Sequence, residues 1–188
     1  MTGPSPALLL ISDSESETVR IGKAIGIALR TGDTVLLSGD LGAGKTRLVH
    51  GMADGIESPI PARSPTFVIV NEYPGRVHLS HCDLYRLGSM EEVEELALEE
   101  RLPTGALVIE WPEGGAKVLP EDVLFLKLEN GDHDDQRSIM FMPTGPRSAG
   151  LLSRSAAVYE SLDAAVGLVH PSAPAAPENS DSSGNENN

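Results

Sequence analysis

"SGDLGAGKTRL", residues 38–48, decides the fold of this chain and directly follows the apolar run Val35–Leu37. Gly39–Thr46 fits the pattern G-x-x-x-x-G-K-[ST], in which glycines let the backbone curl around phosphate oxygens. A helix that begins at Lys45 directs the positive end of its dipole at the same anion. Because an apolar run precedes the loop and a helical pattern follows it, we predict a strand, a phosphate-binding loop and a helix in succession.

Each position of this loop has an expected role in binding ATP. The backbone N–H groups of the loop converge on phosphate oxygens. Lys45 is expected to bridge the β- and γ-phosphates, and the Thr46 hydroxyl is expected to bind Mg²⁺. The expected nucleotide-binding residues of the loop are Gly39, Gly42, Ala43, Gly44, Lys45, Thr46 and Arg47.

Two carboxylates at strand ends are candidates to complete a magnesium site. Mg²⁺ bound with ATP needs a carboxylate at the end of a neighbouring strand. Asp83 in "HCDLY" and Glu110 in "LVIEWPE" each close an apolar or strand-like segment. Glu110 stands where the chain leaves the sheet before Trp111, at the edge where α/β proteins bind ligands. A solvated turn residue is the alternative interpretation of either carboxylate.

A hydroxyl in the next loop is a candidate sensor of the γ-phosphate. Thr66 follows a Ser-Pro pair in "RSPTFVIV", residues 63–70. Switch loops place a hydroxyl at the γ-phosphate and Mg²⁺ in this way. The ordinary alternative is that Thr66 only begins a strand.

His78, His81, Cys82 and Asp83 are close in the sequence, but we do not predict a zinc site from them. Strand periodicity places His78 and Cys82 on one face and His81 and Asp83 on the other. Four ligands from this segment alone therefore cannot converge on one metal ion.

The composition limits the classes of protein to which the chain can belong. A length of 188 residues with 40 % apolar residues fits one ordinary domain. A net charge of −14 argues against a protein that grips a nucleic-acid backbone by itself. Cys82 is the only cysteine, so no intrachain disulfide is expected. With no signal peptide and no long apolar run, we expect a soluble cytoplasmic protein without a membrane anchor.

The remaining pattern predicts a mixed sheet flanked by helices, which is an α/β fold. Pro74-Gly75 separates two strand-like runs and predicts a hairpin. The acidic segment 90–102 has apolar residues on one helical face and its six glutamates largely on the other. The expected helices are 15–30, 45–53 and 90–102, and the expected strands are 7–12, 33–39, 67–73, 76–85, 106–111, 121–130 and 137–142.

The chain divides near Thr144-Gly145-Pro146 into a patterned body and a looser end. We expect one domain over 1–145 and a helix in 146–170, where apolar residues recur at helical spacing from Leu152. The apolar face formed by these residues allows the helix to dock on the body, on a second copy of the chain, or on nothing stable. Residues 171–188 have the Pro-, Ser- and Asn-rich composition of a disordered tail.

Several of these segments together resemble one known family. "LSGDLGAGKT", "SPTFVIVNEY", "HCDLYRL", "EEVEELALEE" and "VIEWPE" occur in this order, and the chain over about residues 7–145 is similar to the TsaE family, formerly YjeE. The resemblance implies a P-loop NTPase-like ATP hydrolase required for N6-threonylcarbamoylation of adenosine 37 in tRNAs. It also implies that ATP binding and hydrolysis cycle a complex of TsaD and TsaB. In that case tRNA is bound only indirectly, through these partners, which agrees with the acidic composition.

The resemblance also implies roles for individual residues. Thr46 and Glu110 match the Mg²⁺ ligands of the family, and Asp83 matches an acidic residue near the γ-phosphate. The other matches are Thr66 in switch I, Trp111 after the metal-binding glutamate, and Glu15 and Arg137 beside the nucleotide base. The loop "EGGAK" and residues 146–188 depart from the family pattern.

The expected reaction is in-line attack of water on the γ-phosphate, with Lys45 as a catalytic residue and Asp83 or Glu110 orienting the water. Turnover by the chain alone should be slow, because no arginine other than Arg86 is a candidate finger. A small-molecule kinase remains an alternative, although arginine-rich lid segments are absent. A second alternative is an ATP-dependent binding switch in which hydrolysis is not essential. A GTPase is disfavoured, because there is no N-K-x-D segment.

Overall fold

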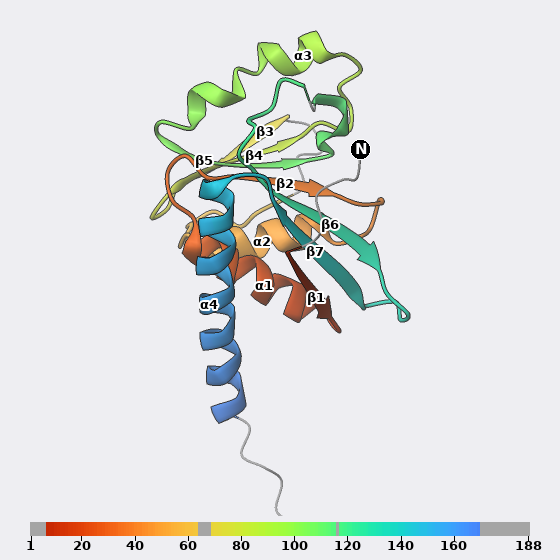
Figure 1. Cartoon of the computed structure of the whole chain (residues 1–188), viewed down its shortest axis with the longest axis vertical. Helices are drawn as coiled ribbons and strands as arrows, with labels where there is room; N and C mark the ends of the chain where they lie inside the picture. The colour runs from red at the N-terminus through yellow and green to blue at the C-terminus, as the bar shows by residue number, and fades with distance from the viewer. Residues whose placement is uncertain (1–6, 64–68, 116, 170–188) are drawn as a thin grey trace, which may run out of the picture.

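A seven-stranded mixed sheet forms the centre of the molecule (Figure 1). The computed structural model describes residues 7–63, 69–115 and 117–169. The spatial strand order is β1-β7-β6-β2-β5-β4-β3, with β6, β2, β5 and β4 parallel and the outer pairings antiparallel. The strands are β1 Leu8–Ser12, β2 Thr34–Ser38, β3 Val70–Tyr73, β4 His78–Asp83, β5 Gly105–Glu110, β6 Leu124–Asn130 and β7 Arg137–Pro143. The predicted α/β fold with a mixed sheet is confirmed, and β3 and β4 form the predicted hairpin at one edge of the sheet.

Helices cover the two faces of the sheet unequally (Figure 1). One face carries α1, α2 and α4 over the larger apolar cluster, which includes Ile25, Leu48 and Phe141. The other face carries α3 and η1 over a smaller cluster that includes Val93 and Leu107. The helices are α1 Glu15–Ala28, α2 Lys45–Gly55, α3 Met90–Glu95 and α4 Pro146–Val169, with 3₁₀-helices η1 Leu98–Arg101 and η2 Pro112–Gly115.

Local sequence signals explain the elements that lead into the phosphate-binding loop. The Ser14 side chain accepts a hydrogen bond from the Glu17 backbone N–H, and the first turn of α1 is acidic, as a helix N-terminus favours. Four of the five residues of β2 are buried, because this strand lies inside the sheet between β5 and β6. The strand therefore delivers the loop to the carboxyl edge of the parallel strands, where ligands bind in α/β proteins.

The helix expected over 90–102 is interrupted, so that prediction was wrong over its second half. α3 ends at Glu95, and Ala97 adopts a left-handed backbone with φ 47° before η1 begins. In a continuous helix Leu98 would lie about 140° around the axis from Val93. The break lets both side chains enter the same apolar cluster, at 3 % and 5 % exposure. Apolar burial thus overrides the helical propensity of the segment.

The C-terminal helix α4 docks on the body, which resolves the three alternatives left by the sequence. Leu151 is fully buried in the larger cluster, and Tyr159 packs against it. The buried carboxylate of Asp33 accepts a hydrogen bond from Arg154 Nη2 at 2.9 Å. The segment 171–188, for which a disordered tail was expected, lies outside the described residues. In the described ranges, none of the helices has the length and apolar character needed to cross a membrane.

Close contact between α1 and α2 depends on glycine. A Cβ atom on Gly51 would lie 2.0 Å from the Val19 carbonyl oxygen, and one on Gly22 would lie 2.1 Å from the Leu48 carbonyl oxygen. Each helix thus presents a glycine where the backbone of the other approaches. This contact sets the position of α2, whose first residue is Lys45.

We expect Gly51→Ala to lower the free energy of unfolding by roughly 1–3 kcal/mol, because the added methyl group must push two backbones apart. The steric cost exceeds the gain of up to about 1 kcal/mol in helix propensity. Chemical denaturation monitored by circular dichroism measures the change. Gly114→Ala is the control, since no atom lies within 4 Å of the added Cβ. Equal stability of the two variants would contradict this account of the helix contact.

Candidate nucleotide-binding site

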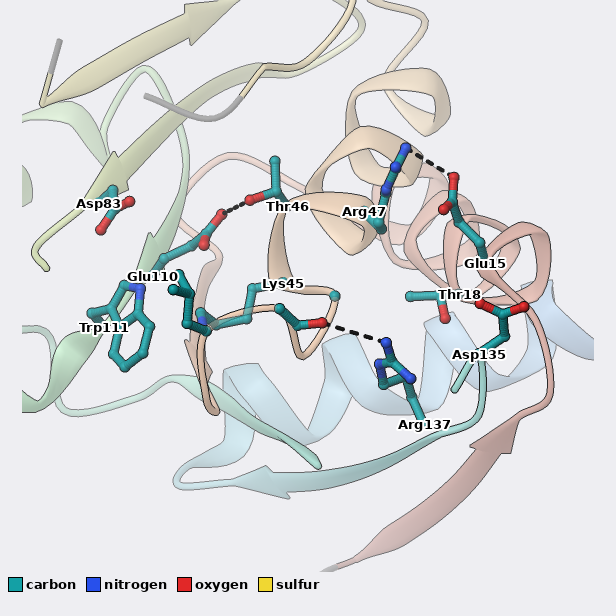
Figure 2. Close-up of a pocket in the computed structure, with 13 residues that line it drawn as sticks. Glu15, Thr18, Lys45, Thr46, Arg47, Asp83, Glu110, Trp111, Asp135 and Arg137 are labelled. Carbon is teal, nitrogen blue, oxygen red and sulfur yellow. Dashed lines mark hydrogen bonds and ion pairs between the residues drawn. The ribbon is translucent and has the colours of Figure 1, made fainter. Parts of the chain in front are cut away.

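A cleft of about 400 Å³ opens at the carboxyl ends of β2, β4 and β5 (Figure 2). Its walls come from the loop after β2, the first turns of α1 and α2, the last residues of β4 and β5, and the start of β7. The site residues expected from the sequence that line it are Glu15, Gly42, Gly44, Lys45, Thr46, Arg47, Asp83, Glu110 and Arg137, with Trp111 beside them. Thr66 lies outside the described residues.

The phosphate-binding loop takes a backbone path that requires glycine. Gly39, Gly42 and Gly44 have φ angles of 144°, 84° and 99°, in the region that side chains disfavour. A Cβ atom on Gly39 would also lie 2.3 Å from the Leu128 carbonyl oxygen. The loop ends in the left-handed Gly44, and α2 begins at Lys45, so the free N–H groups of the helix face the cleft.

The Lys45 ammonium occupies the centre of the loop. Its Nζ donates hydrogen bonds to the carbonyl oxygens of Gly39 at 2.6 Å and Asp40 at 2.9 Å. It also lies 3.7 Å from the centre of the Trp111 ring, in a cation–π contact. Burial lowers the pKa of Lys45, and the nearby carboxylates, Glu110 first, oppose that shift. Among the described residues no carboxylate forms an ion pair with Lys45, and a phosphate group would supply that anion.

The Glu110 carboxylate is buried and hydrogen-bonded from two sides. Its Oε1 accepts from Thr46 Oγ1 at 3.2 Å and lies 2.9 Å from His81 Nε2. Glu110 is 3 % exposed and ends β5, while Thr46 lies in the first turn of α2 (Figure 2). A hydroxyl and a carboxylate therefore meet at one point of the cleft, from residues 64 positions apart.

Asp83 lies beside Glu110, because the two residues are paired in the parallel register of β4 and β5. Burial raises the pKa of Asp83, and the neighbouring Glu110 acts in the same direction, whereas a hydrogen bond from the Tyr85 N–H lowers it. Trp111, the residue after Glu110, has a positive φ of 58°, which is an unusual backbone angle for a residue with a large side chain. Its ring packs against Tyr85 with centroids 4.9 Å apart.

The opposite wall combines residues from α1, α2 and β7. Arg47 forms an ion pair with Glu15 at 2.8 Å (Figure 2). Arg137 donates from Nε to the Ala43 carbonyl oxygen at 3.2 Å and from Nη2 to that of Gly42 at 3.4 Å. Arg137 thus binds the phosphate loop itself as well as lining the cleft.

Four residues at the site were not assigned to it from the sequence. Thr18, Leu41 and Asp135 line the cleft, and His81 contacts Glu110 from behind. Thr18 is hidden inside a helical pattern and Asp135 inside an acidic loop, so neither carries a local signal. The strand alternation that places His81 on the face of Asp83 was the available signal for His81.

The two histidines of β4 make separate contacts. His78 Nε2 lies 2.7 Å from Glu72 Oε2 at the surface, whereas His81 lies in the interior. Across the described parts of the chain, no three His, Cys, Asp or Glu side chains are grouped so as to hold a metal ion. The oxygen groups that meet in the cleft are the Thr46 hydroxyl and the Glu110 carboxylate, with Asp83 beside Glu110.

Comparison with known proteins identifies relatives that share this arrangement of sequence and fold. The family model described as "Threonylcarbamoyl adenosine biosynthesis protein TsaE" matches residues 12–139. The TsaE protein of Streptomyces coelicolor is 41 % identical over 122 residues, which cover 62 % of this chain and 82 % of the relative. The TsaE protein of Treponema pallidum is 40 % identical over 119 residues, which cover 63 % of this chain and 88 % of the relative.

A solved structure supports the same assignment at the level of the fold. The crystal structure of YdiB from Bacillus subtilis superposes with a TM-score of 0.68 and 28 % sequence identity. The alignment covers 83 % of this chain and 97 % of YdiB. Because the family match spans most of the sheet and the whole phosphate-binding loop, the chain belongs to the TsaE family of threonylcarbamoyl adenosine biosynthesis proteins.

Proposed function

We propose that this chain is a magnesium-dependent ATPase that acts in tRNA threonylcarbamoyladenosine biosynthesis. The observation that carries the proposal is the convergence of Lys45, Thr46 and Glu110 in one cleft at a helix N-terminus. Such a helix end, together with a glycine loop, is suited to a polyphosphate. Membership of the TsaE family supports the assignment to this pathway.

The polar groups at the loop fit a magnesium ion. Mg²⁺ prefers oxygen ligands and is usually held by one or two protein groups together with substrate phosphates. Thr46 Oγ1 lies 3.2 Å from Glu110 Oε1, and the Thr46 hydroxyl and the Glu110 carboxylate would hold the ion. When bound, the ion would neutralise charge on the β- and γ-phosphates.

In the proposed reaction a water molecule attacks the γ-phosphate in line with the leaving oxygen. Lys45 moves from the loop carbonyls to the phosphates, and the loop amides stabilise the charge that develops. Asp83 or Glu110 orients the water. A raised pKa is expected of a carboxyl that accepts or donates a proton during the reaction, because the pKa then lies closer to neutral pH, and the pKa of Asp83 is raised.

We further propose that TsaB and TsaD are the partners of this chain and that ATP binding and hydrolysis cycle their complex. The net charge of −14 makes direct binding of tRNA unfavourable, so the partners would hold the RNA in the cytoplasm. Arg86, the one candidate finger from the sequence, is exposed. An arginine supplied in trans is typically worth about 10³–10⁵ in rate, so slow turnover without partners follows.

Two other functions remain alternatives to this proposal. A small-molecule kinase would transfer the γ-phosphate to an acceptor and not to water. An ATP-dependent binding switch would change its conformation on binding ATP and would not need hydrolysis. Measurements of phosphate release and of the Glu110→Gln variant distinguish these three functions.

Lys45→Ala should reduce ATP hydrolysis by about 100-fold or more, because the reaction loses its central cation. The measurement is phosphate release with Mg²⁺, for the chain alone and with purified TsaB, TsaD and tRNA. Wild-type turnover should be slow alone and faster with the pair. Lys23→Ala, at an exposed position of α1 away from the cleft, should behave as wild type. Hydrolysis that survives in Lys45→Ala would refute the proposed site.

Glu110→Gln should keep ATP binding in EDTA and weaken it in Mg²⁺, and at saturating ATP it should lower hydrolysis with TsaB and TsaD by about 100-fold, because the amide removes the negative charge at the metal. Calorimetry measures binding, and multiple-turnover tRNA modification by the complex measures function. A modification reaction that continues at the wild-type rate with this variant would favour the binding switch. Glu100→Gln, at an exposed position of η1, is the matched control.

A further inference from the structure

We propose that His81 is a positioning residue that holds the Glu110 carboxylate in place for magnesium binding. The inference rests on the proposed function, because it concerns the carboxylate of the same site. His81 itself is fully buried and has no direct access to a ligand in the cleft. It would act only through Glu110.

The contact joins two buried side chains. His81 Nε2 lies 2.9 Å from Glu110 Oε1, and the two side chains are 0 % and 4 % exposed. Because an ionised carboxylate only accepts hydrogen bonds, we assign His81 Nε2–H as the donor in this contact. Within the described residues, the buried Nδ1 has no hydrogen-bond partner. The Glu110 contact is therefore the polar interaction that this ring makes.

The sheet and a neighbouring ring determine the direction of the imidazole. His81 and Glu110 lie on the same face of adjacent parallel strands, because Asp83 pairs with Glu110 and lies two positions beyond His81. The imidazole stacks on Tyr73 with centroids 6.3 Å apart and an angle of 28° between the planes. The Tyr73 hydroxyl is itself hydrogen-bonded to the backbone of Arg63. The donor thus lies on a strand of the sheet, and the ring on which it stacks lies on the neighbouring strand.

The position of the hydrogen bond has a consequence for the carboxylate. Thr46 and His81 approach the same atom, Oε1, from two sides. Two fixed donors define the rotation of the carboxylate, and neither of these bonds uses Oε2. Groups that orient a metal ligand in this way are typically worth about 10- to 100-fold in metal affinity. An apolar residue at position 81 would pack among the same neighbours but would leave the carboxylate without this restraint.

The test compares the affinity for ATP in MgCl₂ with the affinity in EDTA, measured by calorimetry on the full chain. The ratio of the two affinities reports the contribution of magnesium without any measurement of turnover. His81→Asn removes the donor at the Nε2 position, whereas His81→Gln places an amide N–H close to it. We expect His81→Asn to lower the ratio by about 10- to 100-fold and His81→Gln to restore most of it. The affinity for ATP in EDTA should be the same in the wild type, in His81→Asn and in His81→Gln.

Ser80→Ala is the matched control, because the buried Ser80 hydroxyl donates to Glu72 and does not contact Glu110. It disturbs the same strand and should leave the ratio unchanged. A magnesium effect in the wild type that persists in His81→Asn would overturn the role of His81 and leave the proposed function standing. A wild-type ratio of one would instead contradict the magnesium site and overturn both. Should His81→Asn not fold, His81→Phe, which retains a flat ring but no donor, takes its place.

Discussion

The contact of the Lys45 ammonium with the backbone carbonyls of Gly39 and Asp40 is the interaction on which the rest of the site depends. A buried cation costs free energy unless oxygens or anions surround it. The loop can wrap around this cation because its glycines accept positive φ angles. The same loop directs backbone N–H groups into the cleft, so the ammonium and the amides together favour an anion with several oxygens.

The sheet explains how residues far apart in the sequence reach this cation. β2 delivers the loop, and β4 and β5 run parallel to it and end at the same edge. Their last residues, Asp83 and Glu110, are therefore next to each other and beside Thr46. The glycine contacts between α1 and α2 determine how closely the helix that starts at Lys45 packs. Packing far from the cleft thus sets the geometry of the polar groups within it.

How much of the protein could be predicted from the sequence depends on the range of the signal. The loop, the strand before it and the carboxylates at strand ends carry local patterns, and the structure places them together. The break at Ala97 was not predictable, because it arises from burial of Leu98 against residues distant in the chain. The side-chain contact of His81 with Glu110 depends on the register of two strands, which alternation alone does not give.

A crystal structure of the chain with Mg²⁺ and a non-hydrolysable ATP analogue tests the central claim most directly. The account predicts that Lys45 Nζ leaves the carbonyls of Gly39 and Asp40 and contacts the β- and γ-phosphates. It also predicts a magnesium ion bound by Thr46 and held in place by Glu110. A nucleotide bound outside this cleft, or one bound here while Lys45 keeps its carbonyl contacts, would contradict it.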